Sequence, residues 1–367
     1  MMIWNWQLPE WPNFTWDRSR MAAVEDQFLL RTGVVIGTAS HLQSEDRQQL
    51  LVEVMSRESM TTSEIEGEIL NRASVQSSVQ RHLGLAADKR RASPAEQGIA
   101  EMMVDLHRRA VEPLTEATLF RWHELVTAGR RDLVDFGKYR TNPEPMQVIS
   151  GAIGKPRVHF EAPPATRVPE EMQRFLHWFN QSATQADASL PAVTRAGIAH
   201  IYFECIHPFE DGNGRIGRAV AEKALAQSFD LPILVSLATT ILAHQKGYYE
   251  ALERANKTLD LTEWLEWFSA IALEAQEGTL AEVEFLIAKT RLFDRLRGQL
   301  NARQQKALLR LFREGPKGFE GGMSASNYAT IAGSSPATTT RDLADLVEKG
   351  ALIRTGENKY ARYRLNC

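Results

Sequence analysis

The feature that most constrains the fold is a thirteen-residue run at positions 207–219. It follows an apolar stretch at 198–206 that predicts a buried helix. An imidazole opens the run and a carboxylate comes four residues later. Residues 212–214 then place a glycine on each side of an asparagine, so that backbone N–H groups can converge on an anion. We predict that a helix begins there, with Asn213 as its N-cap and its positive end facing that anion.

The charged side chains of this run divide between phosphate binding, metal binding and proton transfer. Arg215 and Arg218 lie three residues apart, so they share one helix face, where their forked donors suit phosphate oxygens. Asp211 offers hard carboxylate oxygen to Mg²⁺. His207 can accept a proton near neutral pH, because the unperturbed pKa of histidine is about 6.5. Each piece alone is ordinary in a turn or on a solvated helix, but the ordered set indicates a nucleoside triphosphate site.

This run resembles the signature of the Fic family, His-Pro-Phe-x-Asp/Glu-Gly-Asn-Gly-x-x-x-Arg with an arginine directly after the second glycine. The resemblance implies an all-α catalytic core and a protein adenylyltransferase, which uses Mg²⁺ and transfers AMP from ATP to a hydroxyl of a target protein. It also implies residue roles: general base His207, Mg²⁺ ligand Asp211, anion hole Gly212, Asn213, Gly214 and Arg215, and γ-phosphate contact Arg218. The run is not a P-loop, because no Gly-x-x-x-x-Gly-Lys-Ser/Thr occurs.

A second resemblance lies upstream. Thr62-x-x-x-Glu66-Gly67 is similar to the inhibitory motif that some Fic proteins carry N-terminal to the core. The acidic stretch at 61–68 alone is also typical of a solvated helix start. Thr62 and Glu66 are one helical turn apart and face the same way. If this helix lies beside the site, Glu66 can form a bidentate pair with Arg218 and withhold it from the γ-phosphate. A pair worth a few kcal/mol would keep the competent state at about a per cent or below.

The resemblance places two further residues near the nucleotide. The pattern at 241–258 predicts one helix, in which Tyr249 and Asn256 are two turns apart and share a face. By themselves they are typical of a core tyrosine and a surface asparagine. In the Fic family this pair lies near the adenine and the ribose, so we expect both residues to bind ATP.

The clearest departure from helical patterning lies at 146–160, where two short β-like runs flank residues 151–154. The bland alternative is a surface hairpin without a special role. In Fic proteins a hairpin at this position covers the active site and registers the target. An exposed edge strand can pair with the backbone of a target and place its hydroxyl without reading much sequence.

Composition indicates an ordinary globular protein. Of 367 residues, 43% are hydrophobic and 24% are charged, and the net charge of −3 argues against bulk attraction to nucleic acid or membrane. The two cysteines, Cys205 and Cys367, suggest neither a disulfide framework nor a zinc site, so we expect a cytoplasmic protein. No apolar run is as long as a membrane span, and the N-terminus does not read as a secretory signal.

The expected fold is mainly α and is divided into four regions. Residues 1–110 combine an aromatic segment at 1–17, expected to clamp onto the body, with helices that carry the inhibitory motif. Residues 111–275 form the Fic-type core and residues 276–300 a linker helix. Residues 301–367 predict three helices and a two-stranded hairpin, which resembles a winged helix-turn-helix.

Two alternative functions stay open at this stage. The same scaffold could remove AMP or transfer another nucleotidyl group, with Glu66 orienting a water. Alternatively, the chain is a DNA-binding regulator whose core only senses nucleotide, because Arg341 and a basic hairpin give the last region a surface suited to DNA. Many winged helices only contact proteins, so fold analogy does not decide between these partners. A homodimer is also compatible with the sequence.

Overall fold

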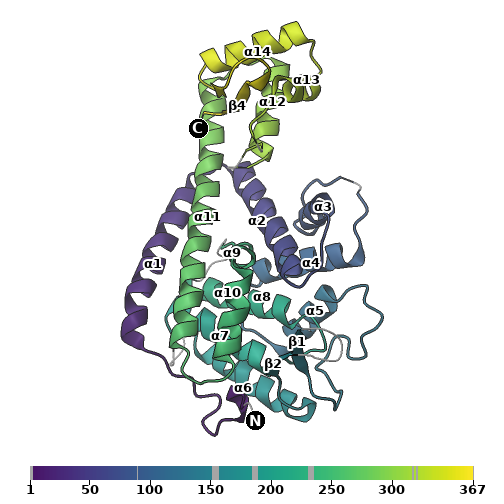
Figure 1. The fold of residues 1–367 in the computed structure, drawn as a ribbon, viewed down its shortest axis with the longest axis vertical. Coiled ribbons are helices and arrows are strands. Elements are labelled where there is room, and N and C mark those ends of the chain that lie inside the picture. Colours follow the sequence, from purple (N-terminus) through teal and green to yellow (C-terminus); the bar gives the residue numbers. More distant parts are fainter. Residues whose placement is uncertain are drawn as a thin grey trace. The chain divides into compact units, whose positions relative to one another are not determined.

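The structure, a computed structural model, is drawn in Figure 1. The residues that it describes are 3–88, 90–150, 157–183, 189–229, 235–315, 318–319 and 321–366. The chain forms two compact units, one of residues 1–33 and 51–277 and one of residues 34–50 and 278–367. Three helices contribute residues to both units: α1 (Arg18–Ser40), α2 (Ser44–Ile65) and α11 (Thr262–Arg295).

The described part of the first unit is mainly α, as predicted. Its further helices are α3 (Arg72–His82), α4 (Pro94–Arg108), α5 (Glu116–Val126), α6 (Val168–Gln181), α7 (Ala192–Ile206), α8 (Asn213–Phe229), α9 (Leu237–Ala243) and α10 (Gln245–Ala255). Local signals explain several of their starts. Ser93 caps α4 in a reciprocal box with Glu96, and Thr115 caps α5.

Helix α7 supplies the core that positions the site. Every residue of α7 except Glu204 is buried, as expected for a helix that is apolar on all sides. Glu25 of α1 satisfies its first turn, because its carboxylate accepts hydrogen bonds from the backbone N of Val193 at 3.1 Å and of Thr194 at 2.6 Å. The predicted buried helix before His207 is therefore confirmed.

The N-terminal aromatic segment is fixed to the first unit. Trp4, Trp6 and Trp11 are buried. Two of the indoles also donate hydrogen bonds, Trp6 to the backbone O of Glu161 at 2.7 Å and Trp11 to Glu171 Oε2 at 2.9 Å. The clamp expected from this segment is therefore present, since buried indoles with satisfied N–H groups hold it in place.

The non-helical excursion is an antiparallel hairpin of β1 (Gln147–Ser150) and β2 (Arg157–Glu161). All four residues of β1 are exposed, whereas Phe160 of β2 is buried and anchors the hairpin to the core. The turn expected at 151–154 lies outside the described residues.

Two helix boundaries predicted from the sequence are wrong. The single helix expected at 241–258 is divided at His244, whose backbone (φ −115°, ψ 27°) separates α9 from α10. The His244 ring bonds Glu274 at 2.9 Å, a tertiary contact that helical periodicity does not encode. The predicted boundary at residue 275, between the core and the linker helix at 276–300, lies inside one helix, α11.

The described part of the second unit follows the predicted order. It contains α12 (Ala302–Arg313), α13 (Ala325–Ala332), α14 (Pro336–Glu348), β3 (Leu352–Thr355) and β4 (Arg362–Leu365). Ser324 and Ser335 cap α13 and α14, and the left-handed Gly333 ends α13. The comparison with a winged helix-turn-helix stays a prediction.

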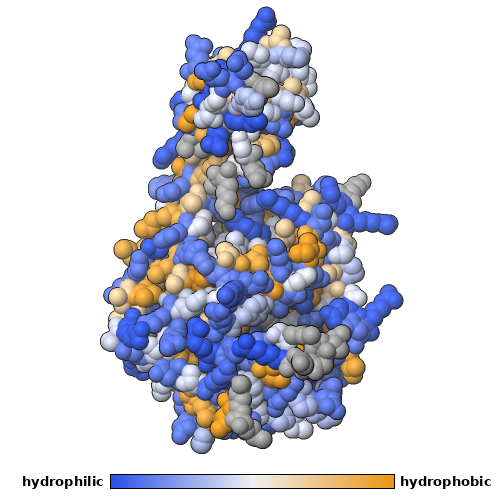
Figure 2. All heavy atoms as spheres, viewed as in Figure 1, coloured by the Kyte–Doolittle hydropathy of each residue, from blue (hydrophilic) through white to orange (hydrophobic). Residues whose placement is uncertain are grey.

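In the part of the chain that the structure describes, every helix is too short or too polar to cross a membrane. Figure 2 shows a mostly hydrophilic face with scattered apolar patches. One patch follows α1, where Leu29 and Leu30 are 50% and 72% exposed.

Candidate active site

His207 follows α7 in the left-handed conformation (φ 50°, ψ 60°), which takes the chain out of the helix at once. Residues other than glycine rarely adopt it, and Arg140 holds this one in place. Arg140 donates from Nε to the His207 carbonyl at 2.8 Å and from its backbone N to the Pro208 carbonyl at 3.0 Å. Burial, reinforced by Arg140, lowers the pKa of His207 to about 4. The imidazole is therefore neutral at physiological pH, the state that a general base requires.

Asn213 closes the loop between α7 and α8, but not as the predicted N-cap. It is the first residue of α8, its Oδ1 accepts from the Phe209 backbone N at 2.9 Å, and its Nδ2 donates to the Phe209 carbonyl at 2.8 Å. The N-cap prediction is wrong because this side chain satisfies both backbone groups of a preceding loop residue. Gly212 allows the turn, with φ 81° and a Cβ position only 2.8 Å from Val126 Cγ2.

Asp211 lies at the open side of the loop. Its Oδ1 accepts from the Gly212 backbone N at 2.6 Å, and Oδ2 accepts from Arg130, which also binds Asp132. A single, partly exposed carboxylate fits Mg²⁺, because this ion is commonly held by one or two carboxylates together with substrate phosphates. No group of three His, Cys, Asp or Glu side chains among the described residues could hold a metal ion alone.

Arg215 is nearly buried and points back toward the same loop. Its Nη1 donates to the Val126 carbonyl at 2.8 Å and to Glu68 Oε2 at 3.1 Å, and Nη2 lies 3.6 Å from Asp211 Oδ2. Sequence analysis did not assign Glu68. The segment after α2 therefore brings a second carboxylate to an arginine of the motif.

Arg218 is 2% exposed and is bound by the last turns of α2. Its Nε donates to Thr62 Oγ1 at 2.8 Å, and its Nη2 donates to the Thr62 carbonyl at 2.8 Å and to Glu66 Oε1 at 2.7 Å. Burial, the largest single cause, lowers the pKa of Arg218, but Glu66, Tyr248 and Glu204 together outweigh it and the pKa is raised. The predicted contact between Glu66 and Arg218 is present, through one Glu66 oxygen rather than as a bidentate pair.

Glu66 also lies against Gly214, one of the residues expected to form the anion hole. A Cβ on Gly214 would lie 2.2 Å from Glu66 Oε1, so this glycine leaves the space that the carboxylate occupies. The backbone conformation of Gly67 determines the position of Glu66. With φ 80°, it allows α2 to end in a Schellman motif, in which Gly67 N bonds the Glu64 carbonyl and Glu68 N bonds the Ser63 carbonyl.

The two residues expected beside the adenine and ribose are not on one face. Tyr249 lies near the site, because its hydroxyl donates to the Ile65 carbonyl at 3.1 Å at the end of α2. Asn256 follows the C-terminus of α10 and is buried, and its Nδ2 donates to the His159 carbonyl of β2 at 3.3 Å. The structure thus brings Tyr249, Glu66 and Arg218 together and places Asn256 against the hairpin.

Sequence analysis assigned no role to three residues of the site, Glu68, Glu204 and Arg130. For the first two, the sequence contains a feature that could have indicated them. Glu68 belongs to the acidic stretch that ends α2, and Glu204 is a lone acid in an apolar helix. Acids are rarely placed among core residues without a reason. Arg130 lies in a loop whose position relative to Asp211 depends on tertiary packing, so no local pattern indicates it.

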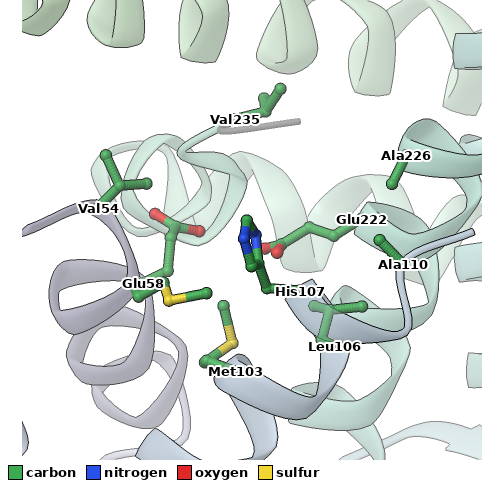
Figure 3. Close-up of a pocket in the computed structure, with 10 residues that line it drawn as sticks. Val54, Glu58, Met103, Leu106, His107, Ala110, Glu222, Ala226 and Val235 are labelled. Atoms are coloured by element: carbon green, nitrogen blue, oxygen red, sulfur yellow. The ribbon is translucent and has the colours of Figure 1, made fainter. Parts of the chain in front are cut away.

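A separate cavity beside α2 also contains acids. It measures about 40 Å³ and is lined by Glu58 from α2, His107 from α4 and Glu222 from α8 (Figure 3). That volume admits a few waters, not a nucleotide. Burial and the neighbouring Glu58 raise the pKa of Glu222 well above its ordinary value. Glu58 accepts three hydrogen bonds, so Glu222 is the carboxyl group that keeps the proton.

Comparison with known protein families identifies two matching segments. Residues 113–225 match the model of the Fic/DOC family, and residues 4–85 match a domain of unknown function, DUF4172. Protein adenylyltransferase Fic of Drosophila grimshawi is 30% identical over 141 residues, covering 32% of this chain and 28% of that protein. A probable protein adenylyltransferase of Aquifex aeolicus is 30% identical over 98 residues, 27% of each chain. The chain thus spans less than a third of the length of these relatives.

The fold itself also has a relative among solved structures. A crystal structure of a Fic family protein from Desulfovibrio desulfuricans G20 superimposes with a TM-score of 0.55 at 23% identity. The match covers 96% of this chain and 98% of that one, so the likeness extends beyond the residues around the motif. The unbroken motif from His207 to Arg218 and the family match around it identify residues 113–225 as a Fic/DOC family domain.

Proposed function

We propose that this protein is an autoinhibited protein adenylyltransferase that transfers AMP from ATP to hydroxyl side chains of target proteins. The observation that carries the proposal is that Arg215 and Arg218, the two cations suited to a triphosphate, are both bound by carboxylates of one upstream segment. Relatives named protein adenylyltransferase support the reaction class.

In the proposed reaction, the hydroxyl oxygen of the target forms a bond to the α-phosphorus of ATP. The bond from that phosphorus to the bridging oxygen of the pyrophosphate breaks, and pyrophosphate leaves with the electron pair. His207 takes the hydroxyl proton, and its neutral state at physiological pH suits that role. The N-terminal backbone of α8 and the two motif arginines would stabilise the charge on the phosphates.

Asp211 is the residue that would hold Mg²⁺ in this proposal. The bound ion would neutralise phosphate charge and help orient the triphosphate. Arg130 now bonds the same carboxylate, so it would have to release Asp211 when the metal–nucleotide complex enters. Arg130 can move, because its side chain is 45% exposed.

Inhibition would follow from competition for Arg218. With Glu66 on Arg218 and above Gly214, the γ-phosphate loses its cation and part of its space. Thr62 strengthens the block through two further hydrogen bonds to the same guanidinium. Release needs only the end of α2 to move, because Glu66 lies beyond its last helical residue.

The target would dock on the hairpin. The four residues of β1 are exposed, and β2 covers only one of its edges. A segment of the target could pair with the other edge and bring its hydroxyl toward His207. This mode reads backbone rather than side chains, so it admits several targets.

The test is incubation with α-labelled ATP and Mg²⁺ in cell lysate, comparing the parent with Glu66→Gly and with Glu66→Gly/His207→Ala. We expect Glu66→Gly to label proteins at least tenfold faster, since a lost charged contact of this kind is worth about 1.5–3 kcal/mol. The double variant should label no protein. Mass spectrometry should find AMP adducts on the proteins that Glu66→Gly labels. If Glu66→Gly labels no more than the parent, or only removes AMP from a modified target, the proposal is wrong.

A second function is favoured by the charge of residues 301–367. They contain eleven Lys and Arg against six Asp and Glu, in a chain of net charge −3. Arg341 at the start of α14 and Arg354 and Arg364 of the hairpin are exposed. We infer that this surface binds DNA through phosphate contacts. Binding to a labelled DNA duplex should weaken as the salt concentration rises and in the Arg341→Ala variant. The His207→Ala variant should bind as the parent does. If the duplex is not bound, or is bound equally at all salt concentrations, this DNA-binding function is excluded.

A further inference from the structure

Glu204 is an acid of α7 that the proposed reaction has not used. It lies three residues before His207, with its side chain 12% exposed, and its Oε2 is 3.9 Å from His207 Nδ1. Among the described residues, neither His207 Nδ1 nor Glu204 Oε1 has a hydrogen-bond partner. The unpartnered Oε1 is the oxygen that lies against Gly217, and Oε2 is the one nearer to His207. Buried polar atoms without a partner are costly, so both side chains call for a functional explanation.

The motif helix provides space for this carboxyl group. A Cβ on Gly217 would lie 2.4 Å from Glu204 Oε1, as one on Gly214 would lie 2.2 Å from Glu66 Oε1. Two glycines three residues apart on α8 thus each accommodate a carboxyl group beside Arg218. One of these carboxyl groups belongs to the inhibitory segment and the other to the helix that carries the base.

The ionisation of Glu204 depends on Glu66. Burial first and Glu66 second raise the pKa of Glu204 and Arg218 opposes them, with a net value of about 8. Glu204 therefore keeps its proton while Glu66 is bound at the site and loses it more readily once Glu66 leaves. The other titratable groups that interact with Glu204 are Cys205, His207, Tyr248 and Tyr249.

We propose that Glu204 is a positioning residue for His207, whose carboxylate holds the Nδ1–H of the imidazole so that Nε2 faces the target hydroxyl. The inference rests on the proposed adenylyl transfer. When Nε2 takes the hydroxyl proton, the ring becomes an imidazolium, and the Glu204 carboxylate stabilises that charge without accepting the proton. The 3.9 Å separation must shorten by about 1 Å to form this hydrogen bond.

This arrangement links activation to base strength. Removal of Glu66 frees Arg218 and also favours the ionised form of Glu204. The same event thus opens the phosphate site and supports the base. An acid that only filled the space at Gly217 would have neither effect.

The test uses the released protein, Glu66→Gly, as the parent for Glu204→Gln, Glu204→Ala and the control Glu64→Gln, an exposed acid on α2. Self-labelling with α-labelled ATP is followed from pH 6 to pH 9, at saturating and at limiting ATP. We expect Glu204→Gln to lower the rate at saturating ATP about tenfold or more, with the ATP requirement unchanged. The rise of the rate with pH should also flatten in that variant, since Gln cannot ionise.

The outcomes separate the two proposals. If Glu66→Gly labels and Glu204→Gln matches it in rate and pH profile while Glu204→Ala fails, Glu204 only fills space and the inference is overturned. If Glu66→Gly does not label at all, adenylyl transfer fails first. The inference is then decided by NMR titration of His207, assigned with His207→Ala. Above the raised pKa of Glu204, where its carboxylate is ionised, the ring ¹⁵N signals of His207 should differ between the parent and Glu204→Gln, and identical signals would overturn the inference.

Discussion

Two acids of the first unit, Glu58 within α2 and Glu66 just beyond its last turn, make contrasting contacts. Glu58 is 1% exposed, and its carboxylate accepts from Ala238 N at 2.7 Å, Thr239 N at 3.1 Å and Thr239 Oγ1 at 2.6 Å. The Glu66 side chain is 34% exposed and makes one hydrogen bond, to Arg218. The Glu58 carboxylate is part of the core, while the Glu66 side chain is about one-third exposed.

Under the proposed autoinhibition, this difference predicts which part of α2 would regulate the site. Removing Glu58 would leave the first N–H groups of α9 buried without a partner, which is unfavourable in any state of the protein. Removing Glu66 exposes an arginine that phosphate can satisfy instead. The middle of α2 is therefore an anchor, and the end is a releasable contact. Under the proposed autoinhibition, a regulator would need to displace only that end.

The largest effect should come from disrupting the anchor. Glu58→Ala leaves three donors buried and unsatisfied, so we expect a loss of roughly 2–4 kcal/mol in the free energy of unfolding. Urea unfolding followed by tryptophan fluorescence measures it. Glu66→Gly, run alongside, should lose far less because its side chain is partly solvated. Equal losses in the two variants would contradict the contrast between anchor and releasable end.

A smaller effect should follow from straining the releasable end. Gly67→Ala forces a Cβ onto a left-handed residue at about 1 kcal/mol, without any clash in the open space around it. If the strain is relieved when the Schellman turn opens, transfer should rise about fivefold. Initial rates with α-labelled ATP measure it. Unchanged transfer together with lower stability would show that Gly67 shapes the turn without controlling Glu66.

A smaller activation of transfer should result when the second carboxylate, that of Glu68, is removed. Glu68 is 37% exposed, and its contact with Arg215 is worth about 0.5–1 kcal/mol. Glu68→Gln should therefore raise transfer two- to fivefold, and should add to the effect of Gly67→Ala less than fully because the residues are adjacent. Glu64→Gln is the matched control on the exposed side. A Glu68→Gln rate equal to that control would remove Glu68 from the inhibitory contact.

The motif, the inhibitory helix face and several helix starts could be predicted from the sequence, because each depends on residues that are close together in the chain. The run from His207 to Arg218 fixes its own spacing, and Thr62 and Glu66 share a helix face by periodicity. The caps Ser93, Ser324 and Ser335 likewise mark helix starts locally.

The misses all depend on contacts between distant segments. Asn213 bonds a loop residue rather than its own helix, and the break at His244 accompanies a bond to Glu274. Asn256 was placed with Tyr249 on the assumption of one continuous helix, but α10 ends at Ala255. Periodicity predicts which faces are buried, not which partner takes each hydrogen bond.

The smallest effect should appear in the pH dependence of stability, and it concerns the anchor. The pKa of Glu222 is raised well above 4.5, by burial first and by Glu58 second. A raised carboxyl pKa stabilises the fold at low pH, and this contribution is lost as pH rises through the raised value. The melting temperature should therefore fall as pH rises above 4.5. Glu222→Gln keeps the shape and a donor toward Glu58 but cannot ionise, so its decline should be about 2 °C smaller. Glu204 adds to the decline in both proteins, since its pKa is also raised. An identical decline in parent and variant would mean that Glu222 is not the proton-bearing partner of Glu58.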